Sequence, residues 1–135
     1  MLKRSLVSIC LSILFAAPVG AFSTVQYHQE LDKAHESLKS GDYKSAYERV
    51  SKLANQGHPC AQCLLGVMYQ KGIGTKKDPA MAQKWLKESA NHGFPDAQSR
   101  LGHMYLNGYL FDKDTKLAEQ WLSKAAKQGV AQAQY

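Results

Sequence analysis

The sequence contains little cysteine and no long apolar run. It holds three cysteines in 135 residues, with 44% hydrophobic and 21% charged residues. So few cysteines exclude a disulfide-dense miniprotein, and the ordinary composition excludes a disordered or collagen-like chain. The apolar run at residues 6–17 is shorter than the roughly 20 residues that a membrane-spanning helix needs. These absences leave one small globular domain.

The sequence also lacks the motifs of common catalytic and metal sites. It has no HExxH pattern, no phosphate-binding loop and no Ser/His/Asp order around a nucleophile turn. His28 and His35 are two helical turns apart and have no cysteine partner at zinc spacing. Asp112 and Asp114 resemble the start of a calcium loop, but Leu117 stands where that loop needs glycine. We therefore predict no catalytic residue, no metal site and no cofactor.

Positive charge exceeds negative charge only mildly. The chain has 17 Lys and Arg against 11 Asp and Glu, which gives a formal net charge of +6 at pH 7. Residues 22–135 keep 15 of the basic residues and all the acidic ones, so their net charge is +4. Because this charge is spread out without an arginine-rich cluster, we predict no nucleic-acid partner.

Residues 1–21 have the pattern of a signal peptide. A positive start at Lys3 and Arg4 precedes the apolar run, and small residues ending at Ala21 form a cleavage site. We expect a periplasmic or secreted protein with no stable membrane insertion once the leader is removed; a retained anchor is the alternative. Cys10 lies in the apolar run, and we expect it to be removed with the leader.

A repeat organises the rest of the chain. Residues 58–93 and 94–129 are identical at 15 of 36 aligned positions, where chance gives roughly 2. A period of this length is typical of a solenoid of stacked supersecondary units. The pairs that carry the pattern are Ala61/Ala97, Gln62/Gln98, Leu65/Leu101, Gly66/Gly102, Met68/Met104, Tyr69/Tyr105, Trp85/Trp121 and Leu86/Leu122.

Each repeat has the pattern of two helices. Apolar residues recur at helical spacing in both halves, and the two tryptophans fall on the apolar face, which favours core packing over ligand stacking. Gly66 offers a flat site where a neighbouring helix can approach closely. Asp78 and Asp114 are predicted N-caps of the second helices. The predicted ends of the second helices are left-handed glycines at Gly57, Gly93 and Gly129.

The flanking segments follow the same plan. Residues 22–57 have two apolar stripes around the turn at Gly41, which predicts an N-terminal hairpin close to a plain tetratricopeptide unit. Residues 130–135 are in register with the start of a first helix, so we predict an incomplete further repeat there. We expect either further repeats of the full-length chain or a partner to cover the last stacking face.

Cys60 and Cys63 lie in the first turn of a predicted helix, with α-carbons about 5 Å apart. Three states are open: a disulfide, two free thiols, or a redox pair whose thiolate the helix N-terminus favours. A disulfide would close a very short loop and stabilise the fold little. No strand–helix–strand pattern surrounds the pair, as a thioredoxin-like motif would require.

The repeated residues resemble the consensus of the Sel1-like repeat family, a branch of the tetratricopeptide superfamily. The resemblance covers residues 46–135. It implies scaffolds that bind other proteins, with exported bacterial members often linked to envelope assembly or host contact. The matching residues are Ala97-Gln98, Leu101-Gly102, Met104-Tyr105, Gly108, Asp114, Ala118, Trp121-Leu122, Lys124-Ala125-Ala126 and Gly129.

The second loop departs from the family pattern. Leu110 replaces the second glycine, which is Gly74 in the first loop. If this position needs positive φ, Leu110 is strained; otherwise the loop takes another shape. The apolar triplet of Tyr109, Leu110 and Phe111 forms either a contact surface or, through Phe111, part of the core between repeats.

The binding residues are predicted at first-helix positions where the repeats differ, because these change chemistry without changing the core. They are Cys63/Ser99, Leu64/Arg100, Val67/His103 and Lys71/Asn107. We predict partner contacts at Arg100, His103, Asn107 and Tyr109.

Together these features predict an all-α, right-handed α/α solenoid of antiparallel hairpins. We predict an exported scaffold for protein–protein interaction without catalysis. The alternative is an envelope enzyme, either a thiol oxidoreductase through Cys60 and Cys63 or a hydrolase of cell-wall or β-lactam substrates.

Overall fold

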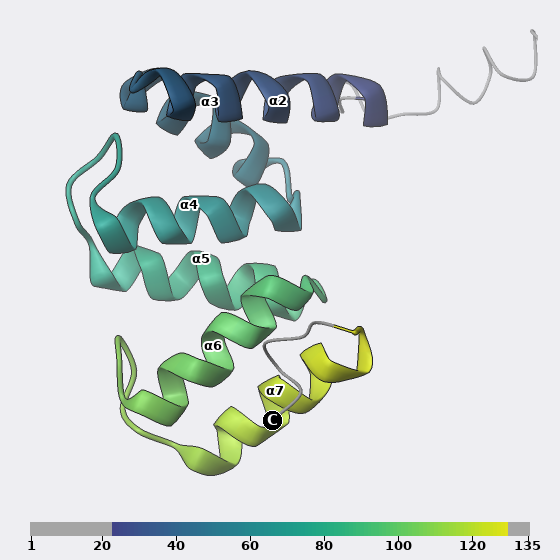
Figure 1. The fold of residues 1–135 in the computed structure, drawn as a ribbon, viewed down its shortest axis with the longest axis vertical. Coiled ribbons are helices and arrows are strands. Elements are labelled where there is room, and N and C mark those ends of the chain that lie inside the picture. Colours follow the sequence, from purple (N-terminus) through teal and green to yellow (C-terminus); the bar gives the residue numbers. More distant parts are fainter. Residues whose placement is uncertain (1–22, 130–135) are drawn as a thin grey trace, which may run out of the picture.

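The computed structural model describes residues 23–129, and Figure 1 shows them as a stack of three helical hairpins. No strand occurs within this range, so the predicted all-α solenoid is confirmed. The predicted signal peptide and the repeat start at residues 130–135 lie outside the described residues. The helices are α2 (Thr24–Ser40), α3 (Tyr43–Asn55), α4 (Pro59–Lys71), α5 (Pro79–Asn91), α6 (Pro95–Asn107) and α7 (Thr115–Lys127).

Aspartate caps begin the second helix of every hairpin. The side chains of Asp42, Asp78 and Asp114 each accept a hydrogen bond from the backbone nitrogen three residues later, at 3.2, 3.1 and 2.9 Å. Such caps satisfy a backbone donor that has no partner inside the helix. The caps predicted at Asp78 and Asp114 are confirmed. The predicted left-handed glycines are also present, with φ of 89° at Gly57, 85° at Gly93 and 81° at Gly129.

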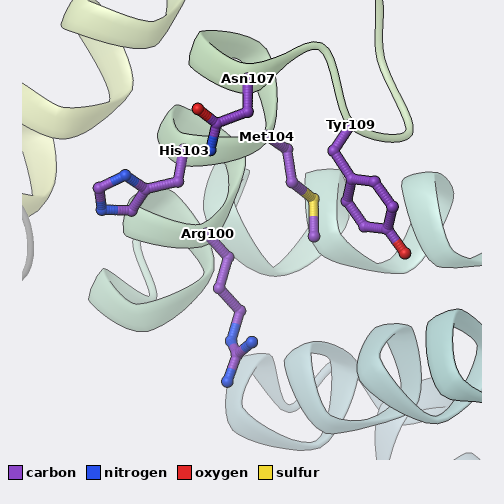
Figure 2. A pocket seen from close by; sticks show the side chains of 5 residues that line it. All are labelled: Arg100, His103, Met104, Asn107 and Tyr109. Atoms are coloured by element: carbon purple, nitrogen blue, oxygen red, sulfur yellow. The ribbon is translucent and has the colours of Figure 1, made fainter.

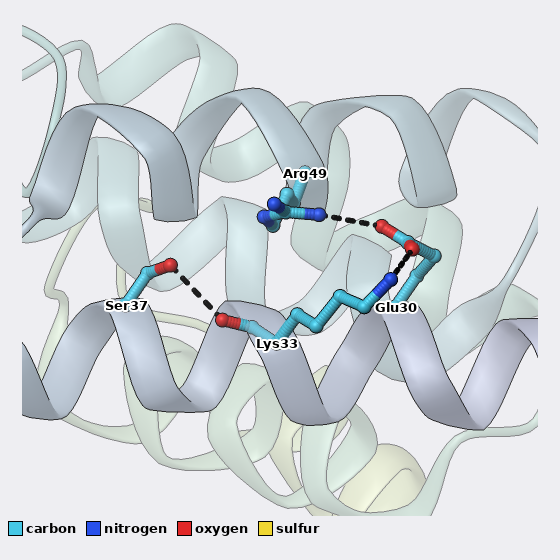
Figure 3. A network of polar contacts seen from close by, with 4 residues as sticks. All are labelled: Glu30, Lys33, Ser37 and Arg49. Atoms are coloured by element: carbon cyan, nitrogen blue, oxygen red, sulfur yellow. Dashed lines mark hydrogen bonds and ion pairs between the residues drawn. The ribbon is translucent and has the colours of Figure 1, made fainter.

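Charged side chains join the helices of the first hairpin. Arg49 Nη1 on α3 lies 2.7 Å from Glu30 Oε2 on α2, and Lys33 Nζ lies 2.7 Å from Glu30 Oε1 (Figure 3). These two cations lower the pKa of the Glu30 carboxyl, with the Lys33 hydrogen bond as the largest cause. Because these side chains are partly exposed to water, the network adds little to the free energy of unfolding and acts mainly on how α2 and α3 are oriented.

The repeat hairpins close around small residues. A Cβ built on Gly66 of α4 would lie 2.7 Å from Leu86 Cγ of α5, and one built on Gly102 of α6 would lie 2.5 Å from Leu122 Cγ of α7. Real Cβ atoms do not approach other atoms this closely, so glycine is required by the packing distance. The close approach predicted at Gly66 is confirmed.

The core is divided between the hairpins. Trp85 is 8% exposed and packs with Val50, Leu53 and Leu65 in the cluster formed by α2 to α5. Trp121 is half-buried against a second cluster built mainly on α5, α6 and α7. Both tryptophans therefore pack in the core, as predicted. Trp121 is the more exposed because no described helix follows α7 in the stack.

Buried glutamines connect each hairpin to the one before it. Gln62 Nε2 donates to Ala54 O at 3.3 Å, and Gln98 Nε2 donates to Ala90 O at 3.2 Å. Both glutamines are buried, so these bonds satisfy polar atoms that would otherwise be costly. The other end of each glutamine side chain contacts the residue that caps the second helix of the same hairpin: His92 Nδ1 lies 2.8 Å from Gln62 Oε1, and Gln128 Nε2 lies 2.8 Å from Gln98 Oε1. We call the two contacts of each glutamine a glutamine bracket.

The second loop keeps the backbone of the first despite its leucine. Leu110 has φ of 62°, close to the 71° of Gly74, so the strained alternative holds and the differently shaped loop is wrong. In the first loop, a Cβ on Gly74 would lie 2.1 Å from Tyr43 O on α3. The second loop has room for Leu110, whose carbonyl oxygen accepts a hydrogen bond from Gln83 Nε2 on α5. Its side chain packs against the second core cluster.

Candidate partner-binding site

The four residues predicted to contact a partner line one pocket. Arg100, His103, Asn107 and Tyr109 surround a hollow of about 310 Å³, together with Met104 (Figure 2). In Figure 2 the side chains of Arg100, Met104 and Tyr109 extend toward the neighbouring helices, while the ring of His103 points away from those helices. The structure therefore brings together three α6 residues that were grouped by their variation between repeats and one residue, Tyr109, from the apolar triplet of the loop.

The helix and the loop after it each place part of this pocket. Arg100, His103, Met104 and Asn107 share a face of α6 because they follow the spacing of i, i+3, i+4 and i+7. Tyr109 follows the left-handed Gly108, and its backbone nitrogen donates to Met104 O at 2.9 Å. This bond folds the loop back over the helix end, which brings the phenol to the same pocket.

The apolar triplet of the loop divides between surface and core. The Tyr109 side chain is 50% exposed, whereas Phe111 is partly buried with its ring centroid 4.5 Å from that of Tyr105. Lys87 Nζ lies 5.0 Å from the centroid of the Phe111 ring, a cation–π contact from α5. Phe111 therefore packs against the core between repeats, whereas Tyr109 lies on the surface and its role in a contact stays a prediction.

A second, more polar hollow adjoins the first. Its volume is about 280 Å³, and Asp96, Ser99, Arg100 and His103 line it. Arg100 and His103 line both hollows, and we call the two adjoining hollows together the groove on α6. Sequence reasoning missed Met104 because this residue is identical in both repeats, and it is in fact 6% exposed. Asp96 could not be recognised as a pocket residue from the sequence, where it differs from the aligned Cys60 but has no other distinguishing feature.

The family follows from the repeats that carry this groove. The model of the Sel1 repeat matches residues 61–94 and 95–130, which is more than half of the chain. The chain belongs to the Sel1 repeat family. Sel1 repeat proteins are typically scaffolds for protein–protein interaction. None of the curated proteins compared with the chain matches it.

Two solved Sel1 repeat structures are similar in both sequence and fold. A Sel1 repeat protein from Oxalobacter formigenes is 34% identical over 69% of this chain and 27% of its own, with a TM-score of 0.66. The protective antigen c5321 of uropathogenic Escherichia coli is 32% identical over 79% of this chain and 24% of its own, with a TM-score of 0.72. The chain thus spans about a quarter of the length of these relatives.

A third structure supports the fold alone. Cysteine rich protein B of Helicobacter pylori is 17% identical over 84% of this chain and 96% of its own, with a TM-score of 0.63. Its agreement with the hairpin stack adds to the assignment of a helical repeat solenoid.

The two cysteines of α4 are free thiols. Cys60 is half-buried and Cys63 is buried, and burial raises the pKa of both, that of Cys63 to about 12. Arg100 lies against the Cys63 thiol and Tyr27 against that of Cys60, but these contacts only partly offset the loss of water. Burial therefore outweighs the lowering of the thiol pKa that was expected from the helix N-terminus. The disulfide stays a prediction for the oxidised protein.

The histidines on α2 lie on the surface. His28 and His35 are exposed, and no group of three or more His, Cys, Asp or Glu side chains within residues 23–129 is arranged to hold a metal ion. Over the same range, no helix has both the length and the apolar character needed to cross a membrane.

Proposed function

We propose that the protein is an exported Sel1 repeat scaffold that binds another protein through the groove on α6 and catalyses no reaction. The observation that carries this proposal is the convergence of Arg100, His103, Asn107 and Tyr109 on one pocket. Arginine and tyrosine are among the side chains that most often dominate binding at protein interfaces. The stacked helices hold them in place before binding, which lowers the ordering cost of association.

The cysteines support the non-catalytic part of the proposal. A thiol oxidoreductase needs a thiolate near neutral pH. Burial moves the pKa of both thiols in the other direction, with that of Cys63 at about 12. At pH 7 both groups are therefore thiols, and the rival of a redox enzyme has no activated nucleophile here.

Capture of a partner tests the groove. Tagged protein is crosslinked in envelope extract, and captured proteins are identified by mass spectrometry. We expect the double variant Arg100→Ala/His103→Ala to lose a specific partner while keeping its helical circular dichroism. The matched control, His35→Ala/Lys44→Ala, removes one histidine and one cation at exposed positions outside the pocket. Equal capture by all three proteins would refute the assignment.

Export is tested by the N-terminus of the protein made in cells. The leader pattern supports cleavage after Ala21. We expect the periplasmic or secreted protein to begin at Phe22, as read by terminal sequencing. A protein that retains Met1 and stays in the cytoplasm would refute export without touching the groove.

A further inference from the structure

The chemistry of the groove on α6 changes along its length. Its first part has the guanidinium of Arg100 and the imidazole of His103, and its last part has the thioether of Met104 and the half-exposed ring of Tyr109. A hollow of about 310 Å³ has the volume of roughly ten water molecules. It accommodates one large side chain and excludes a folded domain.

The charge of Arg100 has no carboxylate within ion-pair distance among residues 23–129. Its polar neighbour is the buried thiol of Cys63 on α4, whose pKa of about 12 keeps it neutral at pH 7. Asp96, one turn earlier on α6, lies in the adjoining hollow without pairing with it. A guanidinium placed beside a neutral group is complementary to an anionic group on a partner.

The distance between the two parts sets a spacing. Asn107 is seven positions after Arg100, which corresponds to roughly 10 Å along α6. Tyr109 lines the same pocket as Asn107. An extended peptide advances about 3.3 Å per residue, so it covers this distance in about three to four residues.

We propose that the groove binds an extended peptide segment of a partner protein, with a carboxylate side chain on Arg100 and an apolar side chain three or four residues away between Met104 and Tyr109. This inference rests on the proposed function and adds the chemistry of the partner. The first repeat does not offer the same site, because Leu64, Val67 and Ile73 stand at the positions of Arg100, His103 and Tyr109.

A peptide array tests the spacing and the charge directly. The array carries eight-residue peptides of serine and alanine with one glutamate and one phenylalanine, separated by zero to six positions. Matched peptides carry lysine in place of glutamate or serine in place of phenylalanine. We expect the strongest binding of the protein at separations of three or four, and about tenfold weaker binding after the lysine exchange. Binding should also weaken at high salt because the charge is at the surface.

Variants assign each preference to its residue. Arg100→Ala should remove the preference for glutamate and keep that for phenylalanine, and Tyr109→Ala should do the reverse. Leu106→Ala and Lys44→Ala remove exposed residues outside the pocket and should behave as the parent protein.

The outcomes separate this inference from the proposed function. The acidic-peptide inference is overturned if binding does not depend on the glutamate, does not depend on the spacing, or keeps both preferences in the Arg100→Ala and Tyr109→Ala variants. It is also overturned by a complete lack of binding to the array. The proposed function fails only if the crosslinking experiment above gives the same capture with and without the groove residues.

Discussion

The two Sel1 repeats share a frame and differ in the face that they present. In both repeats a glycine of the first helix, Gly66 or Gly102, packs against a leucine of the second helix. In both repeats a buried glutamine also donates a hydrogen bond to a carbonyl oxygen of the preceding hairpin. The first helices nevertheless differ in chemistry, since α4 has Leu64 where α6 has Arg100. A solenoid can therefore change its binding surface one repeat at a time without disturbing the packing between repeats.

The largest difference expected between the repeats is in their second-helix leucines. Leu86 is completely buried between two hairpins, whereas Leu122 is only partly buried on the last described helix. Leu86→Ala should lower the free energy of unfolding by about 3 kcal/mol, and Leu122→Ala by about half as much. Urea denaturation followed by circular dichroism measures both. Equal losses would show that α7 is covered as fully as α5.

A loop exchange should have the next largest effect. Gly74→Leu places a side chain against the backbone of Tyr43 and at positive φ, so it should destabilise the fold by about 2 kcal/mol or more. The reciprocal Leu110→Gly removes strain and a partly buried side chain together, so its net effect should be within about 1 kcal/mol. Thermal melts of the two variants test this asymmetry, and similar losses in both would contradict it.

The glutamine brackets should contribute equally to both junctions. Replacing Gln62 or Gln98 with leucine leaves a helix-end carbonyl without its side-chain donor. Each change should cost about 1 kcal/mol in the free energy of unfolding. Chemical denaturation measures the pair side by side. A loss at only one junction would mean that the two brackets are not energetically equivalent.

The smallest effect concerns the junction before the first repeat. His58 stacks on Tyr27, with ring centroids 4.0 Å apart, and burial lowers the pKa of its imidazole. A lowered pKa means that the unfolded chain binds the proton more readily than the folded protein does. The contribution of the neutral His58 to the free energy of unfolding is therefore present above the unfolded pKa of about 6.5 and is lost as the pH falls below it. Between pH 7 and pH 5 the melting temperature should fall by about 2 °C or less through this group. His58→Gln should show a smaller acid shift than the parent; an identical shift would exclude His58 as a source.

Periodicity and caps made most of the fold predictable from the sequence. The spacing of Ala61, Leu65 and Met68, the caps at Asp78 and Asp114 and the glycine at Gly66 act locally or repeat strictly, so their roles can be read without coordinates. The glutamine brackets could not be predicted in this way. Gln62 and Gln98 were visible only as identical residues, and their acceptors lie on the preceding helix.

The candidate site was predictable in part for a similar reason. Variation between repeats singled out Arg100, His103 and Asn107, because a surface position is free to differ where a core position is not. Met104 packs in the core and also lines the pocket. Because it is identical to Met68 in the first repeat, its place in the pocket could not be recognised from variation between the repeats. The pKa of Cys63 depends on how deeply α6 covers it, which the sequence does not state.

The most direct measurement exchanges the face of α6 for that of α4 and leaves the frame intact. The variant combines Arg100→Leu, His103→Val, Asn107→Lys and Tyr109→Ile, so that the second repeat carries the residues of the first at all four positions. Its melting temperature and its capture of the crosslinked partner are measured beside those of the parent protein. We predict an unchanged fold that melts within about 5 °C of the parent and no longer captures the partner. Undiminished capture by a folded variant would contradict the claim that this face selects the partner.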